Sequence, residues 1–193
     1  MGPLDRVARV LTEVLAPSVV VALLPLAVAW AATGAVLPTV GWGLLVAATS
    51  SILPMAVIVW GARSGRWDGH HVRNREGRLI PFLVLIGLGL LGLGLLVVLD
   101  APWLVVALDV IMLVLLLASA AITVVWKVSM HTGVVAGATV VMAVVHGPWW
   151  WAAVLPAAAV AWSRVRLRDH TTGQVVAGAL LGSAVGGLFA LLV

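Results

Sequence analysis

The sequence contains no cysteine, and charged residues make up only 9% of its 193 residues. Without cysteine the chain has no disulfide, no thiolate metal ligand and no cysteine nucleophile, so any chemistry must come from other side chains. The mean hydropathy of +1.20 and the 63% share of hydrophobic residues are outside the range of ordinary water-soluble domains. The composition therefore predicts an integral membrane protein without a separate soluble domain.

Apolar runs between Pro, Gly and charged residues predict an all-α, polytopic bundle of transmembrane helices. The expected spans are 17–37, 41–60, 81–99, 102–126, 131–146, 148–162 and 171–193. The fifth and sixth runs are short and could form a tilted or re-entrant pair, so we expect six to seven spans in a single domain covering 1–193. Residues 1–16 mix charged and apolar side chains without an obvious cleavage site, which favours an interfacial helix over a removable signal peptide.

Lysine is nearly absent, since Lys127 is the only one and the other ten basic residues are arginines. If the chain crosses the membrane at each predicted span, all eleven fall on one side, in or beside the segments 1–16, 61–80, 127–131 and 163–170. The positive-inside rule predicts that this side is cytoplasmic. The bias to Ala, Val, Gly and Arg is typical of a high-GC bacterial genome, so we expect a multi-pass bacterial inner membrane protein. The expected partners are the bilayer and a phosphorylated lipid, not nucleic acid, and an oligomer stays open.

Three polar segments on this side are rich in the side chains that bind phosphate. Arginine matches phosphate oxygens with a planar fork, and the N-termini of helices beginning near 131 and 171 favour an anion. The aspartate-rich patterns with which prenyltransferases and CDP-alcohol phosphotransferases hold Mg²⁺ are absent from the sequence, so we expect no metal and no cofactor. The candidate residues are His71 and Arg78 in the first segment, Lys127, Ser129 and His131 in the second, and Ser163, Arg164, His170 and Gln174 around the third.

The order and spacing of these residues resemble the three signatures of the type 2 phosphatidic acid phosphatase (PAP2) superfamily. Ser163, Arg164 and His170 fit SRxxxxxH, while Ser129 and His131 keep two positions of PSGH. Residues 71–78 are similar to KxxxxxxRP, with His71 in place of Lys and the proline delayed to position 81. Where the family has an acidic residue four positions after the last histidine, this chain has Gln174, as in the HTxxQ of a branch that includes dolichyl diphosphatase.

The resemblance implies a metal-independent mechanism in which His170 attacks phosphorus, while His131 protonates the leaving oxygen and then activates water. It implies that Arg78, Arg164 and Ser129 bind the substrate phosphate, with Ser163, Lys127 and His71 as further candidates. Gln174 shares a helix face with His170 and is expected to fix its tautomer. The hypothesis is a membrane lipid phosphatase that hydrolyses a polyprenyl diphosphate or polyprenyl-linked phosphate through a phosphohistidine.

Three other functions stay open. The substrate could instead be phosphatidate or phosphatidylglycerol phosphate. Because Gln174 carries no charge, the chain could also be a catalytically silent lipid-binding membrane protein. A phosphate-coupled transporter is less favoured, since the sequence lacks paired inverted repeats with interrupted helices.

Two features inside the apolar runs also lead to expectations. Gly178, Gly182 and Gly186 recur every four residues, which predicts a face where another helix approaches closely. Asp109 lies about two turns into the fourth predicted span. An acid within a membrane span is a functional hypothesis by default, although a hydrogen-bonded interfacial acid is favoured here.

Overall fold

The computed structural model describes residues 2–66 and 79–193, and over these ranges it is helical and contains no strand. The predicted all-α class is therefore confirmed for the described residues. The helices are α1 (Pro3–Val14), α2 (Pro17–Thr33), α3 (Val36–Ala47), α4 (Leu53–Arg63), α5 (Leu79–Val98), α6 (Trp103–Val125), α7 (Met130–His146), α8 (Val154–Arg166) and α9 (Thr172–Leu192), with a π turn at Ala48–Ile52 and a 3-10 helix at Pro148–Ala153.

Four helical stretches are long and apolar enough to cross a bilayer: Val36–Arg63, Ile80–Val98, Trp103–Val125 and Thr172–Leu192. The pair α1 and α2, bent by 45°, raises the number to five if it forms one broken span. The six to seven expected spans are not reached by this criterion, because α2 and α7 have 17 residues each and α8 has 13. Each predicted apolar run is nevertheless largely helical, so the difference lies in helix length. The described helices support a membrane protein.

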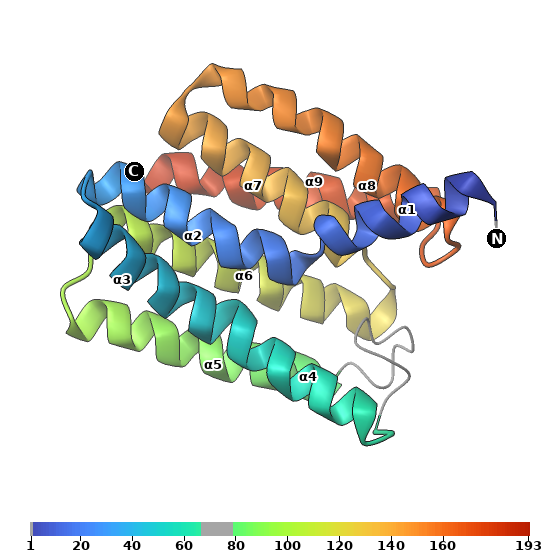
Figure 1. The fold of residues 1–193 in the computed structure, drawn as a ribbon, viewed down its shortest axis with the longest axis horizontal. Helices are drawn as coiled ribbons and strands as arrows, with labels where there is room; N and C mark the ends of the chain where they lie inside the picture. The colour runs from blue at the N-terminus through green and yellow to red at the C-terminus, as the bar shows by residue number, and fades with distance from the viewer. Residues whose placement is uncertain (1, 67–78) are drawn as a thin grey trace. The chain divides into compact units, whose positions relative to one another are not determined.

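The contacts divide the chain into two compact units, and the single domain expected over 1–193 stays a prediction. The terminal unit contains residues 1–20 and 126–193, and the central unit contains residues 21–125. In the central unit, α5 packs against α6 and against the stretch from α3 to α4 (Figure 1). A buried apolar cluster joins these helices and α2, and its members are Ala29, Val46, Leu96, Val105 and Val106.

The long span Val36–Arg63 is interrupted by the π turn at Ala48–Ile52. Pro54 follows this turn at the start of α4. Proline has no N–H, and its ring clashes with the carbonyl four residues earlier, which here belongs to Ser50. A widened π turn relieves this clash without ending the helix.

In the terminal unit, α7 and α9 lie side by side, and α8 packs against both (Figure 1). The close approach depends on glycine. A Cβ atom on Gly182 would overlap the backbone of Gly133, and one on Gly178 would overlap the carbonyl of Ser129. The predicted packing face on the last helix is confirmed, since it faces the glycine side of α7. The amphipathic helix α1 covers α8.

Candidate functional site

The starts of α7 and α9 are joined by hydrogen bonds. The backbone N–H of Ser129 donates to the carbonyl of Gln174 at 3.2 Å, and the Thr132 hydroxyl donates to the carbonyl of Val175 at 3.1 Å. Ser129 is the N-cap of α7, and its Oγ accepts the N–H of Thr132. Because the N-terminus of a helix carries partial positive charge, two such ends next to each other favour an anion at this place.

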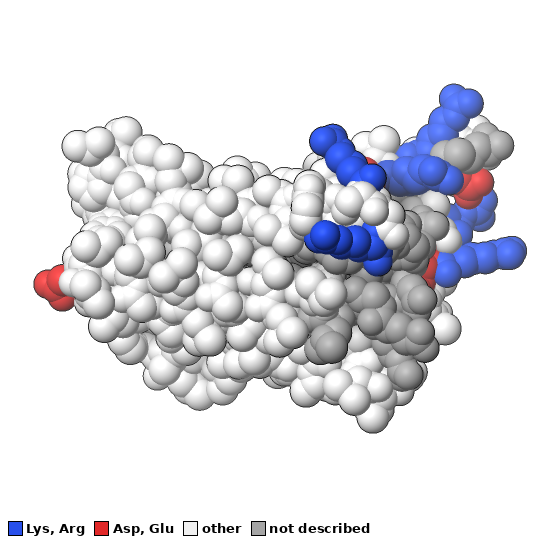
Figure 2. Space-filling model, turned by 90° about the horizontal axis from the view of Figure 1, so that it is seen from below, with Lys and Arg blue, Asp and Glu red and all other residues white. Residues whose placement is uncertain are grey.

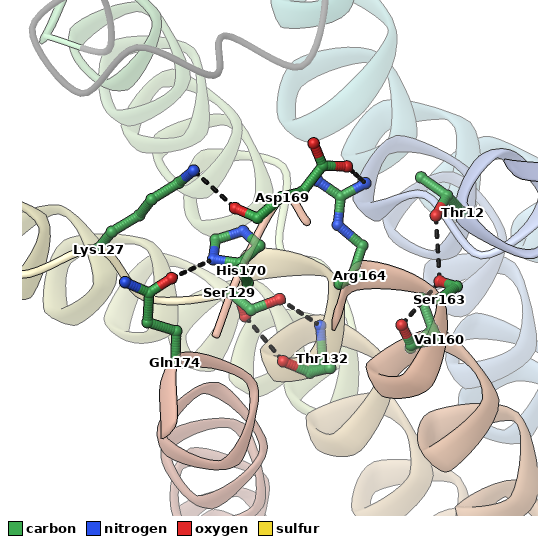
Figure 3. Close-up of polar contacts among 10 residues, drawn as sticks. All are labelled: Thr12, Lys127, Ser129, Thr132, Val160, Ser163, Arg164, Asp169, His170 and Gln174. Atoms are coloured by element: carbon green, nitrogen blue, oxygen red, sulfur yellow. Dashed lines mark hydrogen bonds and ion pairs between the residues drawn. The ribbon is translucent and has the colours of Figure 1, made fainter. Parts of the chain in front are cut away.

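Gln174 has two roles at the start of α9. It forms a capping box with Thr171, in which each side chain accepts the backbone N–H of the other residue. The same Gln174 Oε1 lies 3.1 Å from Nδ1 of His170 (Figure 3). Since a backbone N–H already donates to this atom, it is the amide oxygen, and Nδ1 of a neutral His170 must be the donor. The ring lone pair then lies on Nε2, which is the atom that could attack phosphorus.

His170 and His131 are both largely shielded from water, with 7% and 6% of their surface exposed. His131 lies in the first turn of α7, two residues after the N-cap Ser129. The bond between Ser129 and Gln174 holds this turn against the start of α9, directly after His170. The structure thus places both predicted catalytic histidines at the joined helix starts.

Arg164, in the last turn of α8, forms a buried ion pair with Asp169. Arg164 Nη1 lies 3.1 Å from Asp169 Oδ2, and the two side chains are 4% and 6% exposed. The chain turns back at Arg168, whose φ is +58°, and the N–H groups of Asp169 and His170 both donate to the Arg164 carbonyl. This turn fixes the predicted phosphate-binding arginine close to the predicted nucleophile.

Lys127 lies in the connection between α6 and α7. Its Nζ donates to the backbone carbonyl of Asp169 at 2.7 Å (Figure 3). That carbonyl belongs to the peptide that precedes His170. The lysine therefore adds a second positive charge at the turn, and it also holds the turn against the start of α7.

Ser163 was predicted to bind the substrate phosphate, but in the structure its side chain points away from His170. Its Oγ is fully buried, donates to the carbonyl of Val160 at 2.8 Å and lies 3.1 Å from Thr12 Oγ1. Because the single hydroxyl hydrogen of Ser163 is used on Val160, Thr12 is the donor. In Figure 3 the Ser163 side chain lies beyond Arg164 from His170, where it joins α8 to α1. The predictions for His71 and Arg78 fall outside the described residues.

The described basic residues of the terminal unit lie on α1, before α7 or near the end of α8. They are Arg6, Arg9, Lys127, Arg164, Arg166 and Arg168. Figure 2 shows Lys and Arg in blue, Asp and Glu in red and the other described residues in white. Near the end of α8, Arg166 Nε donates to Asp5 Oδ1 of α1 at 2.9 Å. The Arg166 guanidinium holds the pKa of the Asp5 carboxyl below its ordinary value.

Asp169 and Thr171 are two residues of the site that were not predicted from the sequence. The Thr171-x-x-Gln174 pattern is a capping-box signature and could have revealed the second role of Gln174. No sequence pattern indicated the role of Asp169, because its ion pair with Arg164 depends on the turn at Arg168. Among the described residues, no group of three or more His, Asp or Glu side chains could hold a metal ion.

Comparisons of the chain with models of protein families, with curated proteins and with solved structures found no match. The function is therefore inferred from the chemistry of the site itself. Its central feature is a buried imidazole, oriented by an amide oxygen, at a place where two helix N-termini and two basic side chains meet.

Proposed function

We propose that the terminal unit is the catalytic part of a metal-independent membrane lipid phosphatase of the type 2 phosphatidic acid phosphatase kind. The observation that carries the proposal is the contact between His170 Nδ1 and Gln174 Oε1, with Thr171 N–H on the same oxygen. A histidine held in this tautomer presents Nε2 as a nucleophile. The neighbouring positive groups match the chemistry of a phosphate substrate.

In the first step, the Nε2 lone pair of His170 attacks phosphorus. The bond between phosphorus and the leaving oxygen breaks, and that oxygen keeps the bonding electron pair. It takes a proton from the His131 ring, which is protonated at the start of the cycle. Gln174 supports the charge that develops on the His170 ring through its dipole, without a full negative charge. This weak support suits a diphosphate, because the leaving phosphate is far less basic than an alkoxide.

In the second step, water attacks the phosphorus of the phosphohistidine. His131, now neutral, removes a proton from the water, and the bond between phosphorus and Nε2 breaks. The electron pair returns to the His170 ring and inorganic phosphate is released. Each histidine ends in its starting state, so the cycle needs no metal ion and no cofactor.

The substrate phosphate would be bound by Arg164, by the Ser129 hydroxyl and by the N–H groups at the helix starts. The Ser129 N-cap bond uses an oxygen lone pair, so the hydroxyl hydrogen is available to donate to a phosphate oxygen. Arg164 is bonded to Asp169. Phosphate binding therefore requires the Asp169 carboxylate to give up or share the guanidinium.

A polyprenyl diphosphate or polyprenyl-linked phosphate is the favoured substrate, and phosphatidate or phosphatidylglycerol phosphate is the alternative within the class. The proposal includes a bacterial inner membrane and six to seven crossings, with the shorter helices α2, α7 and α8 also crossing. It places the site at the cytoplasmic face, by the positive-inside rule. In support, the basic residues of the terminal unit gather at the end where α7 and α9 begin.

A second candidate function is that of a catalytically silent, lipid-binding membrane protein. The specific observation in its favour is that Asp169 already engages both nearby cations, Arg164 through its carboxylate and Lys127 through its carbonyl. In this case the positive turn would hold the fold together and bind a lipid headgroup without chemistry.

Phosphate release by the detergent-purified protein in the presence of EDTA tests the proposal. Polyprenyl diphosphate, phosphatidate and phosphatidylglycerol phosphate are compared for the wild type, His170→Ala and His131→Ala. His146→Ala is the matched control, because His146 lies at the opposite end of α7. We expect release that survives EDTA, disappears in His170→Ala and persists in His146→Ala. Absence of release from every substrate would overturn the enzymatic proposal and favour the lipid-binding protein.

A further inference from the structure

Asp109 is a buried acid in the central unit, and the proposed phosphatase site does not use it. It lies in α6, six residues after Trp103, and none of its surface is exposed. Its neighbours Val105 and Leu108 are also fully buried and apolar. An ionised carboxylate in such surroundings is costly unless a positive charge or several hydrogen bonds compensate it.

The described residues supply little of that compensation. Asp109 Oδ1 accepts one hydrogen bond, from Ser50 Oγ at 3.3 Å, and Oδ2 has no hydrogen-bond donor among the described residues. A single long hydrogen bond from a neutral hydroxyl compensates only a small part of the cost of burying the charge. The hydrogen bond expected for Asp109 is present, and its position at the membrane interface stays a prediction.

No charged neighbour within the described part of the central unit faces this carboxyl. The helices α2, α3 and α5 and the π turn contain no titratable residue in their described ranges. The remaining described charged residues of this unit are Arg63 and Arg66, at the end of α4, and Asp100, between α5 and α6, and all three are exposed. The charge of Asp109 therefore has no fixed counter-ion in these ranges.

The hydroxyl that meets Asp109 comes from the π turn. Ser50 is the middle residue of Ala48–Ile52, and the turn is explained by Pro54. The neighbouring Thr49 hydroxyl bonds to the carbonyls of Leu45 and Val46 in its own helix, so Ser50 is the residue that reaches across to α6. Such π turns inside helices are frequent at functional sites. Here the turn places a neutral oxygen ligand beside a carboxylate.

We propose that Asp109 and Ser50 form a buried binding site for a small monovalent cation, either a proton or a sodium ion. The two cations share the chemistry that the site requires, since each neutralises the carboxylate. A proton from bulk water would form an O–H bond at Oδ2. A sodium ion would instead be bound by the carboxylate and by a lone pair of Ser50 Oγ, whose hydrogen would turn away from Oδ1. The site is independent of the phosphatase proposed for the terminal unit.

Infrared spectroscopy of the full-length protein in detergent tests the proposal at neutral pH. Exposed carboxyls are ionised at this pH, so a protonated carboxylic acid band reports a buried acid. If the ligand is a proton, we expect this band in the wild type and in Asp100→Asn, and its loss in Asp109→Asn. If the ligand is sodium, we expect the band to disappear when sodium chloride replaces choline chloride at constant ionic strength. The thermal unfolding midpoint of the wild type would then rise with sodium, and that of Asp109→Asn would not.

Wild-type and Asp109→Asn proteins with the same spectra and the same response to sodium would overturn the proposal. If Asp109→Asn does not fold, Ser50→Ala provides the second test. Loss of the Ser50 hydroxyl should shift the carboxylic acid band if the ligand is a proton, or weaken the stabilisation by sodium if it is sodium. A Ser50→Ala protein identical to the wild type in both measurements would also contradict the site.

Discussion

His170 Nδ1 lies 3.1 Å from Gln174 Oε1, and the same oxygen accepts the backbone N–H of Thr171 at 3.2 Å. One amide thus caps α9 and orients the imidazole. Because this hydrogen bond contributes about 0.5–1.5 kcal/mol, we expect Gln174→Ala to lower kcat for phosphate release by roughly twofold to tenfold. Gln174→Glu, which supplies a full negative charge, should keep or increase kcat. Both values are measured by steady-state phosphate release.

The control for this prediction is Thr171→Ala. It removes the oxygen that caps the N–H of Gln174, at a cost to folding of about 1 kcal/mol, and leaves the contact between Gln174 and His170 in place. We expect a lower thermal midpoint with little change in kcat. Equal losses of kcat in Thr171→Ala and Gln174→Ala would show that the amide acts only through the helix cap.

The ion pair between Arg164 and Asp169 gives a prediction about phosphate binding. Asp169→Asn removes the charge that neutralises a buried guanidinium, and we expect a loss of stability on the order of 3 kcal/mol. Added inorganic phosphate can replace that charge, so it should raise the unfolding midpoint of Asp169→Asn more than that of the wild type. Asp5→Asn, which breaks a more exposed ion pair, is the control. If phosphate shifts all three midpoints equally, Arg164 does not bind phosphate.

The glycine contact between α7 and α9 supports the site through packing. A methyl group at Gly182 meets the backbone of Gly133, which cannot move without separating the helices, whereas one at Gly187 meets nothing within 4 Å. We expect Gly182→Ala to destabilise the fold by about 1–3 kcal/mol and to reduce phosphate release, since the starts of α7 and α9 form the site. Gly187→Ala should match or exceed the wild type in thermal stability. A Gly182→Ala protein with wild-type stability would disprove the close packing.

The pair of Asp5 and Arg166 predicts a dependence on pH at acidic values. Arg166 lowers the pKa of Asp5 in the folded protein, so the pair stabilises the fold above the unfolded value of about 3.9. This stabilisation is lost as the pH falls through the lower, folded value. Titration of the Asp5 carboxyl carbon by NMR should give a midpoint below that of an Arg166→Gln variant. The same midpoint in both proteins would show that the ion pair does not form in solution.

The helices were predictable because their causes are local. The apolar runs at 81–99, 102–126 and 171–193 correspond to helices at Leu79–Val98, Trp103–Val125 and Thr172–Leu192. The number of spans was less predictable, because α7 and α8 have apolar character but lack length.

Only part of the site could be predicted from local spacing. The spacing of four residues between His170 and Gln174 predicted their contact, but the expected shared helix face is wrong. His170 precedes the N-cap Thr171, so the contact forms because the Gln174 side chain reaches back over the cap. The bond of Ser163 to Thr12 joins residues 151 positions apart, and no local pattern contains it. The sequence therefore indicated Ser163 as a phosphate ligand, while the structure uses its side chain to hold α1 against α8.

Trapping the phosphohistidine is the most direct test of the proposed mechanism. The wild-type protein is mixed with polyprenyl diphosphate in EDTA, the reaction is stopped rapidly under alkaline conditions that preserve phosphohistidine, and the peptides are examined by mass spectrometry. We expect a phosphoryl group on His170 that forms during turnover, decays as phosphate is released and is absent from His170→Ala. Phosphate release without a phosphoryl group on His170, or release that continues in His170→Ala, would contradict the proposed mechanism.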